Sequence, residues 1–187
     1  LACGVDTVSI KHASEKKFRY SILSPYFENK NLNREFKHTI KYLNSNYLLL
    51  GEYVRANVKG IISSDLDYHI PYENFNKYLG MIPNPINIDK LKKSEINEKN
   101  KIFILHAINS KNKIKKGNEF FEKSLILIEE KYKNKIKIVK TIDRPYSEHI
   151  INVNECDILL DQVYAYDQGY NALEAMALGK VVFTGAE

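Results

Sequence analysis

Residues 157–185, DILLDQVYAYDQGYNALEAMALGKVVFTG, contain the order of elements that decides the fold. The runs 157–163 and 180–185 are short and apolar, so each is predicted to be a buried strand. Between them lie a loop containing Gly169 and a small-residue helix, NALEAMALG. Strands that lack strict polar alternation and alternate with helices favour a parallel sheet covered on both faces.

The same alternation extends upstream of this stretch. Residues 101–108 and 135–142 are predicted to be strands, and residues 118–132 form a helix with one broad apolar face. A second helix begins after the DRPY segment with Ser147 as its N-cap. The predicted fold is therefore α/β, with a doubly wound parallel sheet that is truncated after its fourth strand.

The first 80 residues are less regular. Residues 33–45 are predicted to be a helix, and residues 46–62 are either a strand that passes into a helix or one helix. Residues 81–91, with two prolines, read as an extended connector. We expect the domain boundary between residues 80 and 100.

Composition narrows the class of protein. The chain has 187 residues, of which 44% are hydrophobic and 27% are charged, as in a soluble globular protein. The net charge of +5 is spread along the chain beside Asn and Glu, which argues against a nucleic-acid partner. No apolar run approaches the roughly 18 to 20 residues of a membrane span. We expect a cytoplasmic protein.

Cysteine and histidine spacing indicates no metal. Cys3 and Cys156 lie far apart and fit neither a disulfide framework nor a zinc site. Five histidines show no spacing typical of metal ligands, and His106 alone lies at a strand end where a site residue is plausible.

Ligands of open α/β sheets bind at the carboxyl ends of the strands. The loop after residue 108 contains Lys111, Lys116 and Gly117, and the loop after residue 163 places Gly169 ahead of a helix N-terminus. Both suit an anion, because lysines add charge and free backbone N–H groups favour phosphate. Glu174, about one turn inside that helix, suits a ribose diol. Together they indicate a nucleotide diphosphate.

Each of these residues also has a purely structural interpretation. The glycines could be turn residues, the lysines could form a solvated loop, and Glu174 could be a solvated carboxylate interacting with the helix dipole. Residue spacing alone leaves these alternatives open.

Three segments, MIPNPIN, KIFILHAINSKNKIKKGNEFF and CDILLDQVYAYDQGYNALEAMALGKVVFTG, carry a resemblance to a known family. They are similar to the carboxyl-terminal, donor-binding domain of GT-B-fold glycosyltransferases of group 1, the family 4-like group. The resemblance covers residues 81–187. It implies a GT-B-type Rossmann-like domain at residues 83–187, truncated at its end. Residues 1–82 would be the remnant of an amino-terminal, acceptor-side α/β domain.

The resemblance also implies roles for individual residues. Lys116 and Gly117 match the family's KG pair at the donor diphosphate, and its usual arginine falls near Ser110 or Lys111. Gly169, Tyr170 and Asn171 match residues at the distal phosphate or donor sugar, and Glu174 matches the ribose-binding glutamate. The family's other glutamate, eight positions earlier, is Tyr166 here, so that acid is absent unless Asp167 or Asp161 replaces it. No catalytic residue is assigned.

The implied function is a glycosyltransferase of polysaccharide biosynthesis. It would transfer a sugar from a nucleotide-diphosphate sugar to a glycan or lipid-linked acceptor, with no metal or further cofactor. Peripheral contact with the inner face of the membrane is left open. We expect the chain to be a piece of a longer protein and inactive, or nearly so, by itself. The alternatives are a nucleotide-sugar epimerase of the same fold and a non-catalytic nucleotide-binding or scaffold protein, which Tyr166 makes plausible.

Overall fold

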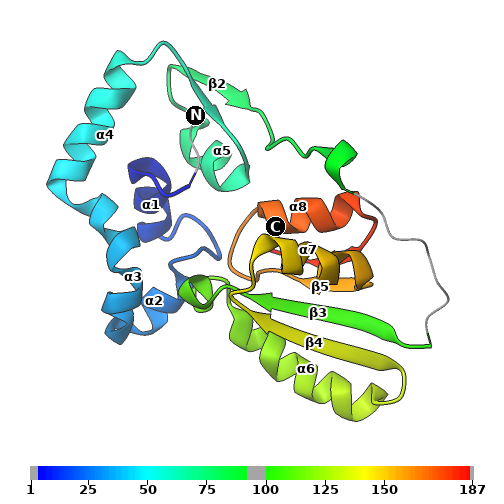
Figure 1. The fold of residues 1–187 in the computed structure, drawn as a ribbon. Coiled ribbons are helices and arrows are strands. Elements are labelled where there is room, and N and C mark those ends of the chain that lie inside the picture. The colour runs from blue at the N-terminus through cyan, green and yellow to red at the C-terminus, as the bar shows by residue number, and fades with distance from the viewer. Residues whose placement is uncertain (1–3, 92–99, 186–187) are drawn as a thin grey trace. The chain divides into compact units, whose positions relative to one another are not determined.

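The computed structural model describes residues 4–91 and 100–185, and the chain divides into two compact units (Figure 1). Unit 1 holds the residues up to Asn84 together with Ala165–Asp167. Unit 2 holds the described residues between Pro85 and Tyr164 and those from Gln168 to Gly185. Sequence alone places residues 165–167 in the second domain, whereas in the structure they pack with unit 1.

Unit 2 is built on one parallel sheet. Its strands are β3 (Ile102–Ile108), β4 (Ile136–Ile142), β5 (Ile158–Leu160) and β6 (Val181–Phe183). Their order in the sheet is β4-β3-β5-β6, and every pair is parallel. The prediction of an α/β fold with a parallel sheet is confirmed, and the order is compatible with a Rossmann-like fold.

Helices cover both faces of this sheet. On one face, α7 (Tyr146–Glu155) and α8 (Tyr170–Ala177) contribute Val153 and Ala175 to a core with Phe103, Leu105 and Leu159. On the other face, α6 (Asn118–Tyr132) packs Leu125 against Ile104 and Leu160. Both faces of β3 and β5 are therefore buried, which explains why these strands show no polar alternation.

Several predicted boundaries differ from the structure. The helix over 118–132 agrees with α6, but the strands predicted over 157–163 and 180–185 are limited to β5 and β6. The N-cap prediction for Ser147 is wrong, because α7 begins at Tyr146 after Pro145. Pro145 has φ −61° and ψ 154°, so its ring fixes an extended residue immediately before the helix.

Unit 1 is mostly helical. Its elements are α1 (Thr7–Ser14), α2 (Ser24–Glu28), η1 (Lys30–Leu32), α3 (Asn33–Ile40), η2 (Lys41–Leu43), α4 (Ser45–Asn57), β1 (Ile61–Ser63), α5 (Leu66–Tyr72) and β2 (Tyr78–Met81). The two strands pair in parallel. The helix predicted over 33–45 corresponds to α3 and η2, and residues 46–62 form most of α4 followed by the start of β1.

The core of unit 1 gathers around Phe36 and Leu23, with Ile10 and Ala13 from α1. A smaller cluster joins Ile61 of β1 to Tyr72 of α5. The predicted connector over 81–91 begins at the last residue of β2 and includes a short 3-10 helix, η3 (Ile88–Lys90). Among the described residues, no helix is long and apolar enough to cross a membrane.

Candidate functional site

A pocket of about 410 Å³ opens at the carboxyl ends of β3 and β4 in unit 2. Its walls come from the ends of these two strands, from the segments that follow them, and from three residues of α8: Tyr170, Asn171 and Glu174. The strand order places β3 between β4 and β5, so the order along the chain reverses at β3. Such a switch point is where open α/β sheets bind ligands.

The pocket brings together four of the seven residues singled out from sequence. Lys116, Tyr170, Asn171 and Glu174 line it, although Lys116 lies more than 50 residues before the other three. Lys111, Gly117 and Gly169 lie in the same two loops but do not line the pocket. The strand-end rule, that ligands of open α/β sheets bind at the carboxyl ends of the strands, therefore predicts the position of this pocket better than it predicts which side chains line it.

Asp161, immediately after β5, holds two of these residues in place. The residue is 1% exposed. Its Oδ1 accepts hydrogen bonds from Lys116 Nζ at 2.8 Å and from Asn171 Nδ2 at 3.2 Å. The buried carboxylate thus balances the charge of Lys116, a pairing that a buried acid requires. Of the three ammonium N–H bonds of Lys116, two remain for other acceptors.

Glu174 is a buried acceptor of a hydrogen bond, and it is not a solvated carboxylate. Its residue is 9% exposed, and Oε1 accepts from the Tyr146 hydroxyl at 2.8 Å. This hydrogen bond is the main cause of a raised pKa for Tyr146, because it stabilises the protonated phenol. The structure therefore excludes one of the alternatives left open by the sequence.

His149 on α7 holds the other side of Asn171. The distance between His149 Nε2 and Asn171 Oδ1 is 2.6 Å. With this amide orientation, the histidine ring donates and Asn171 accepts, while the amide nitrogen donates to Asp161. Asn171 is thereby fixed at both ends, facing the pocket at the first turn of α8.

The loop after β3 is held against the end of β4. Asp143 accepts from the backbone N of Ser110 at 2.9 Å and from its hydroxyl at 2.6 Å. These two hydrogen bonds lower the pKa of the Asp143 carboxyl. The loop also starts with a local turn, because Asn109 Oδ1 accepts from the backbone N of Lys111 at 3.1 Å. Lys111 is therefore part of a constrained turn.

Gly117 and Gly169 occupy their positions for different structural reasons. Gly117 has φ +67°, and a Cβ there would lie 3.0 Å from Val163 Cβ and 3.1 Å from the Tyr164 ring. It is a turn and packing residue. Gly169 has φ −78° and is the N-cap of α8, without a side-chain cap hydrogen bond. The only described atom that a Cβ there would meet within 4 Å, its chain neighbours apart, is Asp161 Oδ2, at 3.8 Å.

Tyr166 and Asp167 belong to unit 1 and do not line the pocket. The Tyr166 ring lies 4.6 Å from the Phe18 ring, and its hydroxyl accepts from Arg19 N at 3.2 Å. Asp167 Oδ2 accepts from Leu66 N at 3.0 Å. In return, the Asp67 carboxylate accepts from the backbone N of Tyr166 at 3.2 Å and of Asp167 at 3.3 Å.

Asp161 and Asp167, the two acids that lie near Tyr166 in the sequence, are both already engaged in hydrogen bonds. Asp161 is paired with Lys116, and Asp167 bonds to the backbone at the start of α5. Near this contact, burial raises the pKa of Asp65 to about 6, and Asp67 also has a raised pKa through burial. About 100 residues separate the segments 66–67 and 166–167. No local sequence pattern therefore predicts the hydrogen bonds between them.

Sequence reasoning missed Tyr146, His149 and Asp143, which all follow β4. The carboxyl end of that strand also belongs to the ligand-binding edge, so the rule applied to the other two loops points to this segment as well. His106 does not line the pocket. It is fully buried on β3 with its ring 5.7 Å from the Phe121 ring, and burial lowers its pKa.

Among the described residues, no group of three or more His, Cys, Asp and Glu side chains is arranged to hold a metal ion. Comparisons of the chain with protein-family models, with curated proteins and with solved structures found no match.

Proposed function

We propose that unit 2 binds the diphosphate and ribose of a nucleotide sugar, and that the intact protein is a GT-B-fold glycosyltransferase. It would transfer the sugar to a glycan or lipid-linked acceptor. The observation that carries this proposal is the pocket at the carboxyl ends of β3 and β4, which combines Lys116, Asn171 and Glu174. A cation, an amide at a helix start and a buried carboxylate match the parts of a nucleotide diphosphate.

The diphosphate would lie between Lys116 and the start of α8. Gly169 provides no side-chain cap, so the first backbone N–H groups of α8 are left for an anion. Lys116 is held by Asp161 with its side chain 28% exposed, so its ammonium stays at the pocket wall. These groups would stabilise the charge that develops on the diphosphate as its bond to the sugar breaks.

The ribose would lie against Glu174. Tyr146 occupies Oε1 of this carboxylate, and no described residue donates a hydrogen bond to Oε2. A ribose diol supplies the donors that this oxygen lacks. The acceptor hydroxyl would then attack the anomeric carbon and lose its proton, while the nucleotide diphosphate leaves. The group that takes this proton is not assigned.

The test is isothermal titration with UDP and with GDP. We expect Glu174→Gln to weaken binding about tenfold, because a charged acceptor of hydrogen bonds is lost while the side chain keeps its size. The matched control is Glu130→Gln, which removes the same charge from an exposed position on α6. Equal affinities of the wild type, Glu174→Gln and Glu130→Gln for both nucleotides would refute the ribose assignment.

A second candidate, a nucleotide-binding protein without catalysis, is favoured by the position of Tyr166. The family resemblance expects an acid there, and this side chain packs on Phe18 within unit 1. A screen of the intact protein with labelled nucleotide sugars separates the possibilities. Transfer to an acceptor supports the proposal, and an epimerised donor indicates an epimerase. Binding without any product supports the non-catalytic candidate.

A further inference from the structure

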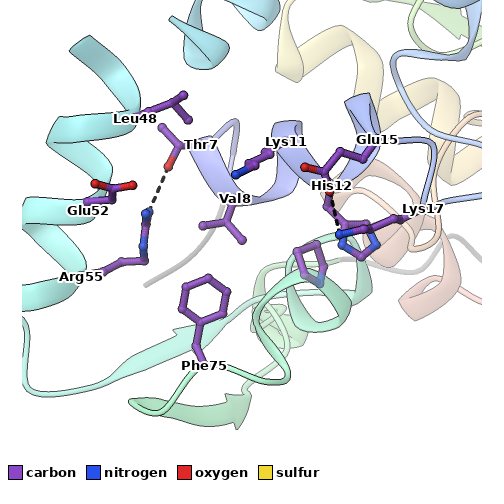
Figure 2. Close-up of a pocket in the computed structure, with 11 residues that line it drawn as sticks. Thr7, Val8, Lys11, His12, Glu15, Lys17, Leu48, Glu52, Arg55 and Phe75 are labelled. Atoms are coloured by element: carbon purple, nitrogen blue, oxygen red, sulfur yellow. Dashed lines mark hydrogen bonds and ion pairs between the residues drawn. The ribbon is translucent and has the colours of Figure 1, made fainter. Parts of the chain in front are cut away.

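Unit 1 contains a pocket of its own, of about 280 Å³, lined by α1, α4, α5 and Phe75 (Figure 2). None of the residues assigned to the nucleotide sugar belongs to it. One part of its lining is apolar and includes Val8, Leu48 and Phe75. The other part carries charged side chains of α1, of α4 and of the residues just after α1, Glu15 and Lys17. Pockets of this mixed kind are typical of ligand sites.

Arg55 of α4 is the central cation of this pocket. Its Nη1 donates to Thr7 Oγ1 at 3.1 Å, and its Cζ lies 5.7 Å from the centroid of the Phe75 ring. Gly51, one turn earlier, leaves the space for this contact. A Cβ there would lie 2.4 Å from Thr7 Oγ1 and 2.9 Å from Arg55 Nη1. The guanidinium is thus positioned by the packing of α1 on α4.

The guanidinium has donors to spare. It is half-buried and also interacts with the Tyr72 hydroxyl, but no carboxylate of the described residues forms an ion pair with it, although Glu52 lies one turn away. A guanidinium has five N–H donors in a planar fork that suits carboxylate and phosphate groups. An acidic group of a ligand would therefore complete a contact that the described part of the chain leaves open.

The surrounding charges favour an anion. The pocket combines three basic side chains, Lys11, Lys17 and Arg55, with two acidic ones. Glu15 is already paired with Lys17 at 2.6 Å, whereas Lys11 forms no ion pair with a described residue. His12 lies in the same pocket, and its pKa is lowered, first by burial and next by the charge of Lys17, against the opposing effect of Glu15. Lys11 and Arg55 remain for the ligand.

We propose that this pocket binds a small organic anion, with its acidic group on Arg55 and Lys11 and its apolar body against Val8 and Phe75. The acidic group is a phosphate monoester or a carboxylate, since the guanidinium fork accepts either. This site is independent of the nucleotide-sugar pocket in unit 2. A volume of about 280 Å³ restricts the ligand to a small molecule.

The test is a titration of the full chain with phenyl phosphate and with benzoate, followed by backbone amide chemical shifts. We expect shifts in α1 and in residues 51–55, weaker binding at high salt, and no binding of uncharged phenol. The probe that binds more tightly shows whether the acidic group of the ligand is a phosphate monoester or a carboxylate. Shifts confined to residues 107–174 would assign the probe to the pocket of unit 2 and overturn the inference, as would binding of neither probe.

Two substitutions with opposite expected effects on affinity test the role of the charged side chains. Arg55→Gln should weaken binding of the stronger probe about tenfold, and the exposed Arg34→Gln should leave it unchanged. Glu52→Gln should strengthen binding about two- to threefold, because it removes a repulsive charge at an exposed position. Since Glu52→Gln leaves the Thr7 contact intact, it stays informative even if Arg55→Gln unfolds. Unchanged affinity in Glu52→Gln, or equal losses in Arg55→Gln and Arg34→Gln, would overturn the inference.

Discussion

The loops that follow β3 and β5 leave the same edge of one sheet but are held by different units. The loop after β3 is tied within unit 2, through Ser110 to Asp143 and through Lys116 to Asp161. Part of the loop after β5, Ala165–Asp167, packs within unit 1 through Tyr166 and Asp167. Residues that are adjacent in the sequence can therefore stabilise different units of one molecule.

We expect the largest effect from removal of the Asp161 carboxylate, which binds Lys116 in the loop after β3. Asp161→Ala leaves the Lys116 ammonium and the Asn171 amide without their shared acceptor. We expect a loss of about 3 kcal/mol in the free energy of unfolding, because one charge of a largely buried pair stays uncompensated. Urea unfolding measures it. The exposed pair Glu119 and Lys123, at 3.6 Å, is the control, and Glu119→Ala should cost less than about 0.5 kcal/mol.

Gly117 and Gly169 lie in these two loops, and we expect them to differ in how well they tolerate a side chain. Gly117→Ala should destabilise by about 2 kcal/mol, because of its positive φ and the short distances to Val163 and Tyr164. Gly169→Ala should be nearly neutral, because its φ of −78° is accessible to alanine. Thermal or urea unfolding of both variants compares them directly. Equal losses would mean that the two loops constrain their glycines alike.

The acids near 165–167 predict a pH dependence of unit 1. Burial raises the pKa of Asp65 to about 6, above its ordinary value of 3.8. A raised pKa means that the folded state binds the proton more tightly, so this contribution to stability is present below pH 4 and is lost as pH rises through about 6.

Asp65→Asn removes this dependence. At pH 7 we expect the variant to be about 1 kcal/mol more stable than the wild type, a value reduced for the partial exposure of Asp65. At pH 4 the difference should nearly vanish. Urea unfolding at the two pH values, with the exposed Asp89→Asn as control, checks the sign. A constant difference between the two pH values would contradict it.

We expect the smallest effect from removal of the Tyr166 hydroxyl, which lies in the loop after β5 and accepts a hydrogen bond from Arg19 N. Tyr166→Phe keeps the ring beside Phe18 and removes the acceptor for Arg19 N. The exposed hydrogen bond should contribute about 0.5 kcal/mol. Amide hydrogen exchange of Arg19 should rise in Tyr166→Phe and stay unchanged in Tyr170→Phe. Unchanged exchange in both variants would mean that the hydroxyl does not anchor this segment.

The sequence predicts some parts of the fold and the site, and it misses others. The helix 118–132 is predictable because its apolar residues recur with the period of a helix, and the strands 101–108 and 135–142 are predictable because they are short, mainly apolar runs. The strand-end rule then places Lys116, Tyr170, Asn171 and Glu174 near one edge. Sequence patterns favour Ser147 over Pro145 as the helix cap, because serine is a common N-cap residue. The residues after β4 were missed although the rule on strand ends applies to that strand as well.

Sequence by itself determined the alternation of strands and helices, the parallel sheet and the strand ends at which the pocket lies. Hydrophobic period and chain order are local properties, so they can be read without coordinates. Only the tertiary structure decided that Lys116 pairs with Asp161, that Tyr146 bonds to Glu174, and that Tyr166 belongs to unit 1. These contacts join residues 28 to 147 positions apart, and no local pattern encodes which distant partner satisfies a buried polar group.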